Sequence, residues 1–121
     1  MASNVIDLDI LRPAAKIIKL NGKTFDVSFI PVAITFDVDE IVRKLSKIDQ
    51  KELDDGNSDA TKEAFDLTIK LCVLFVSHFY PEMDEDWFRE HTDSSQIKVF
   101  ADTIKDALLA SYNGIENYGK N

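Results

Sequence analysis

The stretch TKEAFDLTIKLCVLFVSHFY, residues 61–80, decides the fold of this chain, and Pro81 closes it. Its apolar residues recur at intervals of three and four and form two adjacent stripes, which is the spacing of a broad helix face. The stripes consist of Ala64, Leu67, Thr68, Leu71, Cys72, Phe75 and Phe79, and of Phe65, Ile69, Val76 and Tyr80. A buried strand over residues 71–79 is the alternative, but the length and the twin stripes favour a helix. We therefore predict a helix with Ser58 or Asp59 as its cap, covered by other elements or by a partner.

Two strands are predicted before this helix, over Ala14–Leu20 and Lys23–Ile30. They are joined by Asn21-Gly22, a strong hairpin signal because a type I′ turn needs positive φ at both central residues. The two-residue loop predicts the pairs Leu20–Lys23, Ile18–Phe25, Lys16–Val27 and Ala14–Phe29. One face then carries Ile18, Leu20, Phe25, Val27 and Phe29, with Ile17 as an apolar exception on the other face. Two strands alone are marginal in water, so the long helix is their expected cover, and their edges are open to a strand from another copy.

The segment after the hairpin is predicted to turn away from the sheet and to form a helix that begins at Asp37. Glu40 stands three residues later and completes a capping box. Residues 50–59, QKELDDGNSD, are polar and contain a glycine, which indicates a linker between two helices.

Two further helices are predicted after Pro81. A short one is capped by Asp84 and ends near His91, and a longer one covers residues 96–112 with Asp93 as its cap and Asn113-Gly114 as its end. The element order predicts a single α+β domain over residues 1–121. In it an N-terminal β-hairpin, or small antiparallel sheet, packs on a mainly helical bundle of three longer helices and one short helix. Residues 1–9 and 115–121 are expected to be flexible tails.

Composition narrows the classes of partner. The chain has 14 basic and 22 acidic residues and a formal net charge of −8, which disfavours binding to nucleic acid or to anionic membranes. Its single cysteine, Cys72, is consistent with a reducing compartment. We see no secretory signal and no apolar run of the roughly 18 residues that a membrane span needs, so we expect a cytoplasmic protein.

The residues give little sign of catalysis or of a bound metal. Cys72 and His78 stand six residues apart and so do not share one spot on a helix. His78 and His91, with Glu82 or Asp84, lack a fixed zinc-binding frame. The oxygen-bearing residues of the linker, Asp54, Asp55, Asn57 and Asp59, lack the alternate ligand spacing of a calcium loop. The glycines are scattered and form no phosphate loop. We therefore predict a protein that is not an enzyme and has no cofactor and no metal.

Three segments resemble the small tail assembly chaperones of long-tailed, siphovirus-like phages and prophages of Gram-positive bacteria. They are IKLNGKTFDVSFIP at residues 18–31, ITFDVDEIVRKL at residues 34–45, and the long stretch that continues through PEMDEDWFREHT to residue 92. The features that carry the resemblance are Tyr80-Pro81-Glu82 at the end of the apolar helix and the acidic helix start Asp84-Glu85-Asp86-Trp87. The resemblance spans roughly residues 10–112.

The resemblance implies a non-catalytic role in tail morphogenesis. Such proteins are made in the host cell cytoplasm, bind and solubilise the tape-measure protein, recruit tail-tube subunits and are absent from the mature virion. In many of them a programmed ribosomal frameshift adds an extension that contacts the tail-tube protein, and a chain that ends at Asn121 corresponds to the short form. A structural virion component, such as a connector or tail-terminator subunit, is the alternative, and a small enzyme or metal protein is a third.

The apolar segments of the predicted helix and hairpin are candidates for contact with the partner. The residues that we name as candidate contacts are Phe25, Phe29, Val73, Leu74 and Val76. Self-association into a homo-oligomer is expected as well. A monomer that buries all of these residues in its own core is the plainer interpretation, because most large apolar side chains are buried.

Overall fold

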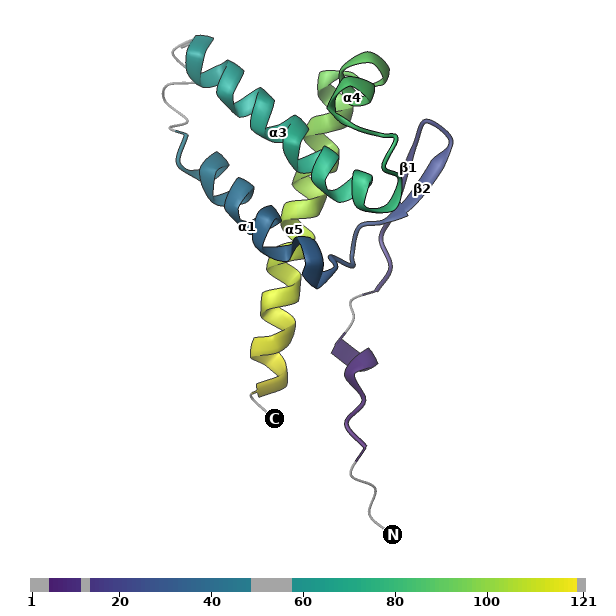
Figure 1. Ribbon diagram of the computed structural model, residues 1–121. Coiled ribbons are helices and arrows are strands. Elements are labelled where there is room, and N and C mark those ends of the chain that lie inside the picture. Colours follow the sequence, from purple (N-terminus) through teal and green to yellow (C-terminus); the bar gives the residue numbers. More distant parts are fainter. Residues whose placement is uncertain (1–4, 12–13, 49–57, 120–121) are drawn as a thin grey trace.

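The computed structural model describes residues 5–11, 14–48 and 58–119, and it describes side chains in the last of these ranges only from Asp59 to Tyr112. The elements, in order, are a 3-10 turn η1 (Leu8–Leu11), β1 (Ile17–Leu20), β2 (Lys23–Asp26), α1 (Val32–Ser46), α3 (Ser58–Phe79), α4 (Glu85–His91) and α5 (Ser94–Gly119). Figure 1 shows the small hairpin beside a bundle of helices. The predicted α+β class is therefore confirmed.

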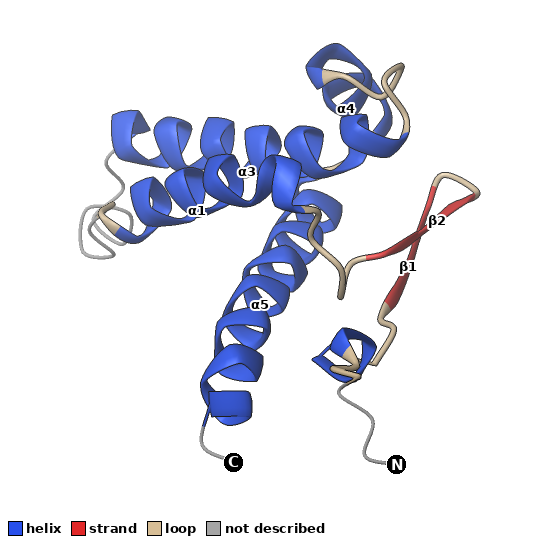
Figure 2. Cartoon of the chain, turned by 60° about the horizontal axis from the view of Figure 1, so that its bottom comes forward, coloured by secondary structure: helices blue, strands red, loops and turns tan. Residues whose placement is uncertain are grey.

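The core is built around α3, as the sequence predicts. Leu71, Cys72, Phe75 and Val76 are fully buried. In Figure 2 α1 lies side by side with α3, and α5 runs at a steep angle to both. The short α4 is held by the buried Phe88 and by an exposed ion pair of 3.0 Å between its Arg89 and Asp66 of α3. The apolar middle of α3 is thus covered by the protein's own fold.

The hairpin has the predicted turn and the predicted register. Asn21 and Gly22 have φ values of 51° and 83°, as a type I′ turn requires. The ladder contains the predicted pairs Leu20–Lys23 and Ile18–Phe25. Phe25 contacts Tyr80, directly after α3, and Phe100 of α5, with ring centroids 5.4 Å and 5.8 Å apart, so the hairpin is covered jointly by the end of the long helix and by α5.

Both strands are shorter than predicted, and Ala14 and Phe29 do not pair in the ladder. The cause is the side chain of Asp26. Its Oδ1 accepts hydrogen bonds from the backbone N–H groups of Lys16 and Ser28 and from the Ser28 hydroxyl. These bonds form a turn directly after β2, so Val27 is fully buried while Phe29 is left 43% exposed.

The predicted start of α1 at Asp37 is wrong, because the helix begins five residues earlier, at Val32. Pro31 occupies the N-cap position, and its carbonyl accepts hydrogen bonds from the Ile34 N–H and the Thr35 hydroxyl, both at 3.0 Å. The strand-forming residues of this segment suggest extended backbone by their propensity. Burial of Ile34 and Val38 on one helical face outweighs that propensity.

The caps of the last two helices are confirmed. Asp84 accepts a hydrogen bond of 2.9 Å from the Trp87 N–H at the start of α4. Asp93 and Gln96 form a reciprocal capping box, in which each side chain bonds the other residue's N–H. The predicted end of the last helix at Asn113-Gly114 is wrong, because α5 continues to Gly119.

Parts of the predicted flexible tails are helical, whereas most of the predicted linker lies outside the described residues. Residues 115–119 belong to α5, and η1 takes up the end of the N-terminal segment that we expected to be loose. A glycine inside a helix costs about 1 kcal/mol relative to alanine, which need not end the helix. The predicted linker and calcium-type residues at positions 50–57 lie outside the described residues, while Ser58 and Asp59 form the first turn of α3.

Candidate functional site: an apolar groove between three helices

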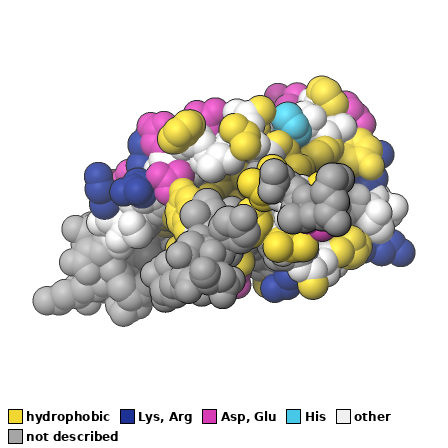
Figure 3. Space-filling model, turned by 90° about the horizontal axis from the view of Figure 1, so that it is seen from below, with side chains coloured by type: hydrophobic (Ala, Val, Ile, Leu, Met, Phe, Trp, Pro, Cys, Tyr) yellow, Lys and Arg dark blue, Asp and Glu magenta, His cyan; other side chains and the backbone are white. Residues whose placement is uncertain are grey.

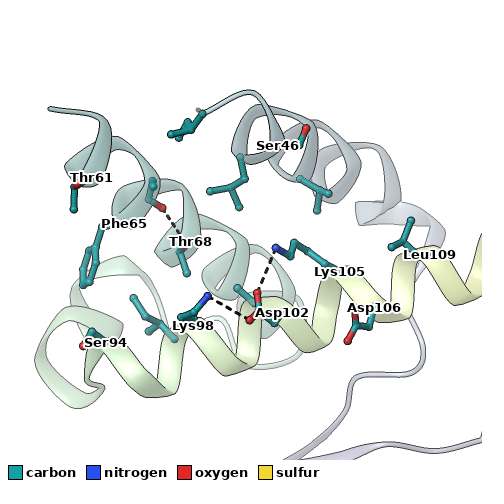
Figure 4. A pocket seen from close by; sticks show the side chains of 16 residues that line it. Ser46, Thr61, Phe65, Thr68, Ser94, Lys98, Asp102, Lys105, Asp106 and Leu109 are labelled. Atoms are coloured by element: carbon teal, nitrogen blue, oxygen red, sulfur yellow. Dashed lines mark hydrogen bonds and ion pairs between the residues drawn. The ribbon is translucent and has the colours of Figure 1, made fainter. Parts of the chain in front are cut away.

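An open groove runs between α1, α3 and α5. It exists because α1 packs on α3 but makes little contact with α5, so the three helices diverge. The groove has a volume of about 660 Å³. Figure 4 shows its side chains converging from the three helices. They are Val42, Leu45 and Ser46 of α1, with Ile48 just after it; Thr61, Ala64, Phe65 and Thr68 of α3; and Ser94, Ile97, Lys98, Ala101, Asp102, Lys105, Asp106 and Leu109 of α5.

The lining of the groove is mainly apolar. Phe65 and Leu109 are 42% and 57% exposed, which are large fractions for side chains of this size and kind. The polar Thr68 in the wall bonds the carbonyl of Ala64 at 2.7 Å, so its hydroxyl is already satisfied within the helix. The surface therefore favours an apolar occupant over a polar one.

Charged residues of α5 form one rim of the groove. Asp102 makes ion pairs with Lys98 at 3.6 Å and with Lys105 at 3.3 Å, as Figure 4 shows. Such exposed pairs contribute little to folding stability, typically about 0–1 kcal/mol. Their position beside an apolar floor is that of a polar rim around a binding surface.

A second exposed apolar feature lies on the outer face of α1. Val32 and Phe36 stand one helical turn apart and are 86% and 84% exposed. Neither residue lines the groove. The view from below in Figure 3 shows hydrophobic side chains gathered at the surface of the molecule.

The structure does not bring the five predicted contact residues together on a surface. Phe25 and Val76 are core residues, and Val73 and Leu74 are half-buried against the core. Only Phe29 is exposed; it lines a separate aromatic cleft of about 380 Å³ with Phe25, Phe79 and Tyr80.

The groove residues were missed by the sequence reasoning. Ala64, Phe65 and Thr68 belong to the stripes that predict α3, but a stripe does not show which of its parts stays uncovered. That depends on the angle between helices, and the only sequence signal was the unusual breadth of the apolar face.

The residues considered for chemistry are also placed by the structure. The Cys72 thiol is buried, donates to the carbonyl of Ile97 at 3.4 Å, and has its pKa raised by burial to about 12. His91 stacks on Trp87 and places its Nδ1 2.9 Å from the Trp87 carbonyl, while His78 packs edge-on against Phe79. Among the described residues, no group of three or more His, Cys, Asp or Glu is placed to hold a metal ion.

In the described ranges, no helix has both the length and the apolar character needed to cross a membrane. The chain matches no protein-family model, no curated protein and no solved structure.

Proposed function

We propose that this protein is a tail assembly chaperone of the phage type, and that its groove holds an apolar helical segment of a tape-measure protein. The observation that carries the proposal is the open, mainly apolar groove between α1, α3 and α5. Amphipathic helices are commonly recognised in hydrophobic grooves of this kind, through anchors at positions i, i+3, i+4 and i+7.

The shape and chemistry of the groove support a helical occupant. Helices form its walls, and a docked helix would pack against them by the same side-chain interdigitation that joins α1 to α3. Its apolar stripe would cover Phe65 and Leu109, while its flanking polar residues would meet the charged rim on α5. The acidic net charge would help to keep such a complex in solution.

The sequence resemblance supports the biological setting of the proposal. The features that carry it lie where α3 ends and α4 begins, and Asp84 in the acidic motif is the cap of α4. On this proposal the protein acts without catalysis in the host cytoplasm, recruits tail-tube subunits after it has bound its client, and leaves before the virion is complete.

Co-expression with a tape-measure protein from the same genome tests the proposal. The wild-type chain is expected to keep the client in the soluble fraction, and Phe65→Ser combined with Leu109→Ser is expected to abolish that effect. Phe36→Ser is the matched control, because it removes an exposed aromatic ring of α1 that lies outside the groove. Ala64→Phe, which fills the groove without adding a polar group, should also abolish solubilisation.

Circular dichroism of each variant separates loss of binding from loss of folding. The groove proposal fails if folded groove variants solubilise the client as well as the wild type does, or if Phe36→Ser alone abolishes the effect. Mass spectrometry of purified particles tests the wider role. A stoichiometric amount of this chain in mature particles would favour the alternative, a connector or tail-terminator subunit, and would overturn the chaperone proposal.

A further inference from the structure

The N-terminal arm, residues 5–11, has the sequence pattern of a strand that lacks its partner. Ile6, Leu8 and Ile10 alternate with Asp7 and Asp9, which is the period of a strand buried on one face. In the single chain the end of the arm is a 3-10 turn, and the three aliphatic side chains are 67%, 66% and 69% exposed. The pattern is therefore not used for burial within one copy.

The hairpin offers the matching edge. Among the described residues its sheet contains only β1 and β2. The Val27 N–H bonds the Lys16 carbonyl, so the hydrogen-bonded pairs fall on even-numbered residues of β1. The backbone groups of Ile17 and Lys19 consequently point away from β2, toward the open edge of the strand.

An apolar groove lies beside β1. It has a volume of about 410 Å³ and is lined by Ile18 and Leu20 of β1 and by Val99 and Phe100 of α5, with Lys19, Ser95 and Gln96 at its border. Val99 is 63% exposed. Consider a strand that pairs with β1 and has its aliphatic residues on the same face of the sheet as Ile18. Its alternate aliphatic side chains would point toward this groove.

The charges of the two segments are complementary. The arm carries Asp7 and Asp9, and β1 carries Lys19 on the face opposite to Ile18 and Leu20. In a strand that directs its aliphatic residues into the groove, both aspartates fall on the opposite face, which is also the face of Lys19. Opposite charges on neighbouring strands stabilise a sheet and help to fix its register.

We propose that the N-terminal arm of one copy adds as a third strand to the β1 edge of a second copy. Figure 1 shows the arm extending away from its own hairpin. Its end, η1, contacts α5 of the same chain, but Ile6, Leu8 and Ile10 remain largely exposed and so are accessible to a second copy. The contact joins two different surfaces, arm and edge. It therefore propagates head to tail into a ring or an open chain, unless two copies exchange arms reciprocally. The client groove between α1, α3 and α5 takes no part in this contact.

Sedimentation velocity of the full chain over a wide range of concentration tests the proposal. The wild type is expected to form species of at least twice the monomer mass, and added salt should weaken them because the contact is partly ionic. Two variants should be monomeric: one with Ile6, Leu8 and Ile10 all replaced by serine, and one with Lys19→Glu. Val5→Ser with Leu11→Ser is the matched arm control and should still assemble.

A charge exchange makes the test specific. Asp7→Lys with Asp9→Lys should be monomeric alone, but an equal mixture with the Lys19→Glu chain should form a mixed assembly. The proposal is overturned if the wild type is a monomer at every concentration. Hydrogen exchange that finds the arm of such a monomer protected would show that it pairs with its own hairpin instead. The proposal is also overturned if the serine arm variant assembles like the wild type, since another surface would then join the copies, or if the mixture stays monomeric.

Discussion

At the scale of the single residue, burial of the Cys72 thiol makes the stability of the fold depend on pH. Its pKa is raised by desolvation from an ordinary value of 9.0 to about 12. Below pH 9 the thiol is protonated in both states, and its contribution to stability is fully present. As the pH rises above 9, the unfolded chain loses the proton while the folded chain keeps it, so stability falls until the pH passes the folded pKa.

Between pH 8 and pH 10 the free energy of unfolding of the wild type is expected to fall by about 1.4 kcal/mol more than that of Cys72→Ala. Urea unfolding of both chains at pH 8 and pH 10 measures it. Lysine and tyrosine also titrate in this range, but they do so in both chains and cancel in the comparison. Equal losses in the two chains would show that the thiol ionises as readily in the folded protein as in the unfolded one.

The hairpin turn depends on two backbone conformations. Gly22 has φ of 83°, and a Cβ built on it meets nothing within 4 Å, so substitution by alanine causes strain without a clash. Gly22→Ala is expected to lower the free energy of unfolding by about 1–2 kcal/mol, the cost of a left-handed conformation for an L-residue. Asn21→Gly is the control. Its free energy of unfolding should lie at most a few tenths of a kcal/mol below that of the wild type. An unchanged urea midpoint for Gly22→Ala would rule out the type I′ turn.

At the scale of the element, the sequence predicts best where a short-range interaction determines the outcome. The centre of α3, the hairpin register and the caps Asp84 and Asp93 all follow from local spacing, and the structure confirms them. The end of β2 depends on the Asp26 carboxylate, and the start of α1 depends on which face of the helix reaches the core. These boundaries are set by tertiary contacts, which no local pattern reports.

The capping box of α5 gives a prediction at this scale. Asp93→Ala removes the acceptor for the Gln96 N–H, which lies 2.8 Å from the Asp93 carboxylate. The expected loss is about 1 kcal/mol in the free energy of unfolding, a typical value for the removal of an N-cap side chain. Asp93→Asn keeps a side-chain acceptor and should retain most of the stability. Chemical denaturation of the three chains makes the comparison, and an equal loss in both variants would assign the effect to charge instead of to the hydrogen bond.

At the scale of the whole molecule, one core joins the hairpin to the helices. The Phe25 ring of β2 lies 5.4 Å from Tyr80 and 5.8 Å from Phe100 of α5, measured between centroids. Phe100 in turn lies 6.1 Å from Phe75 in the middle of α3. The candidate groove belongs to this scale too, because it is formed by the divergence of α1 from α5. Apolar periodicity predicts the three helices but not the angles between them, so the groove could not be predicted from sequence.

This shared core predicts that the hairpin and the helices unfold together. Two strands are marginal without a hydrophobic cover, so the hairpin should persist only while Tyr80 and Phe100 cover Phe25. Phe25→Ala is expected to cost about 3–5 kcal/mol in the free energy of unfolding, as for other buried aromatic side chains. The loss should appear equally in three probes: hydrogen exchange of the β1 and β2 amides, fluorescence of Trp87 in α4, and circular dichroism of the helices. If the hairpin amides exchange at lower denaturant concentration than the helices unfold, the hairpin is a separate unit and its cover contributes little to the stability of the whole.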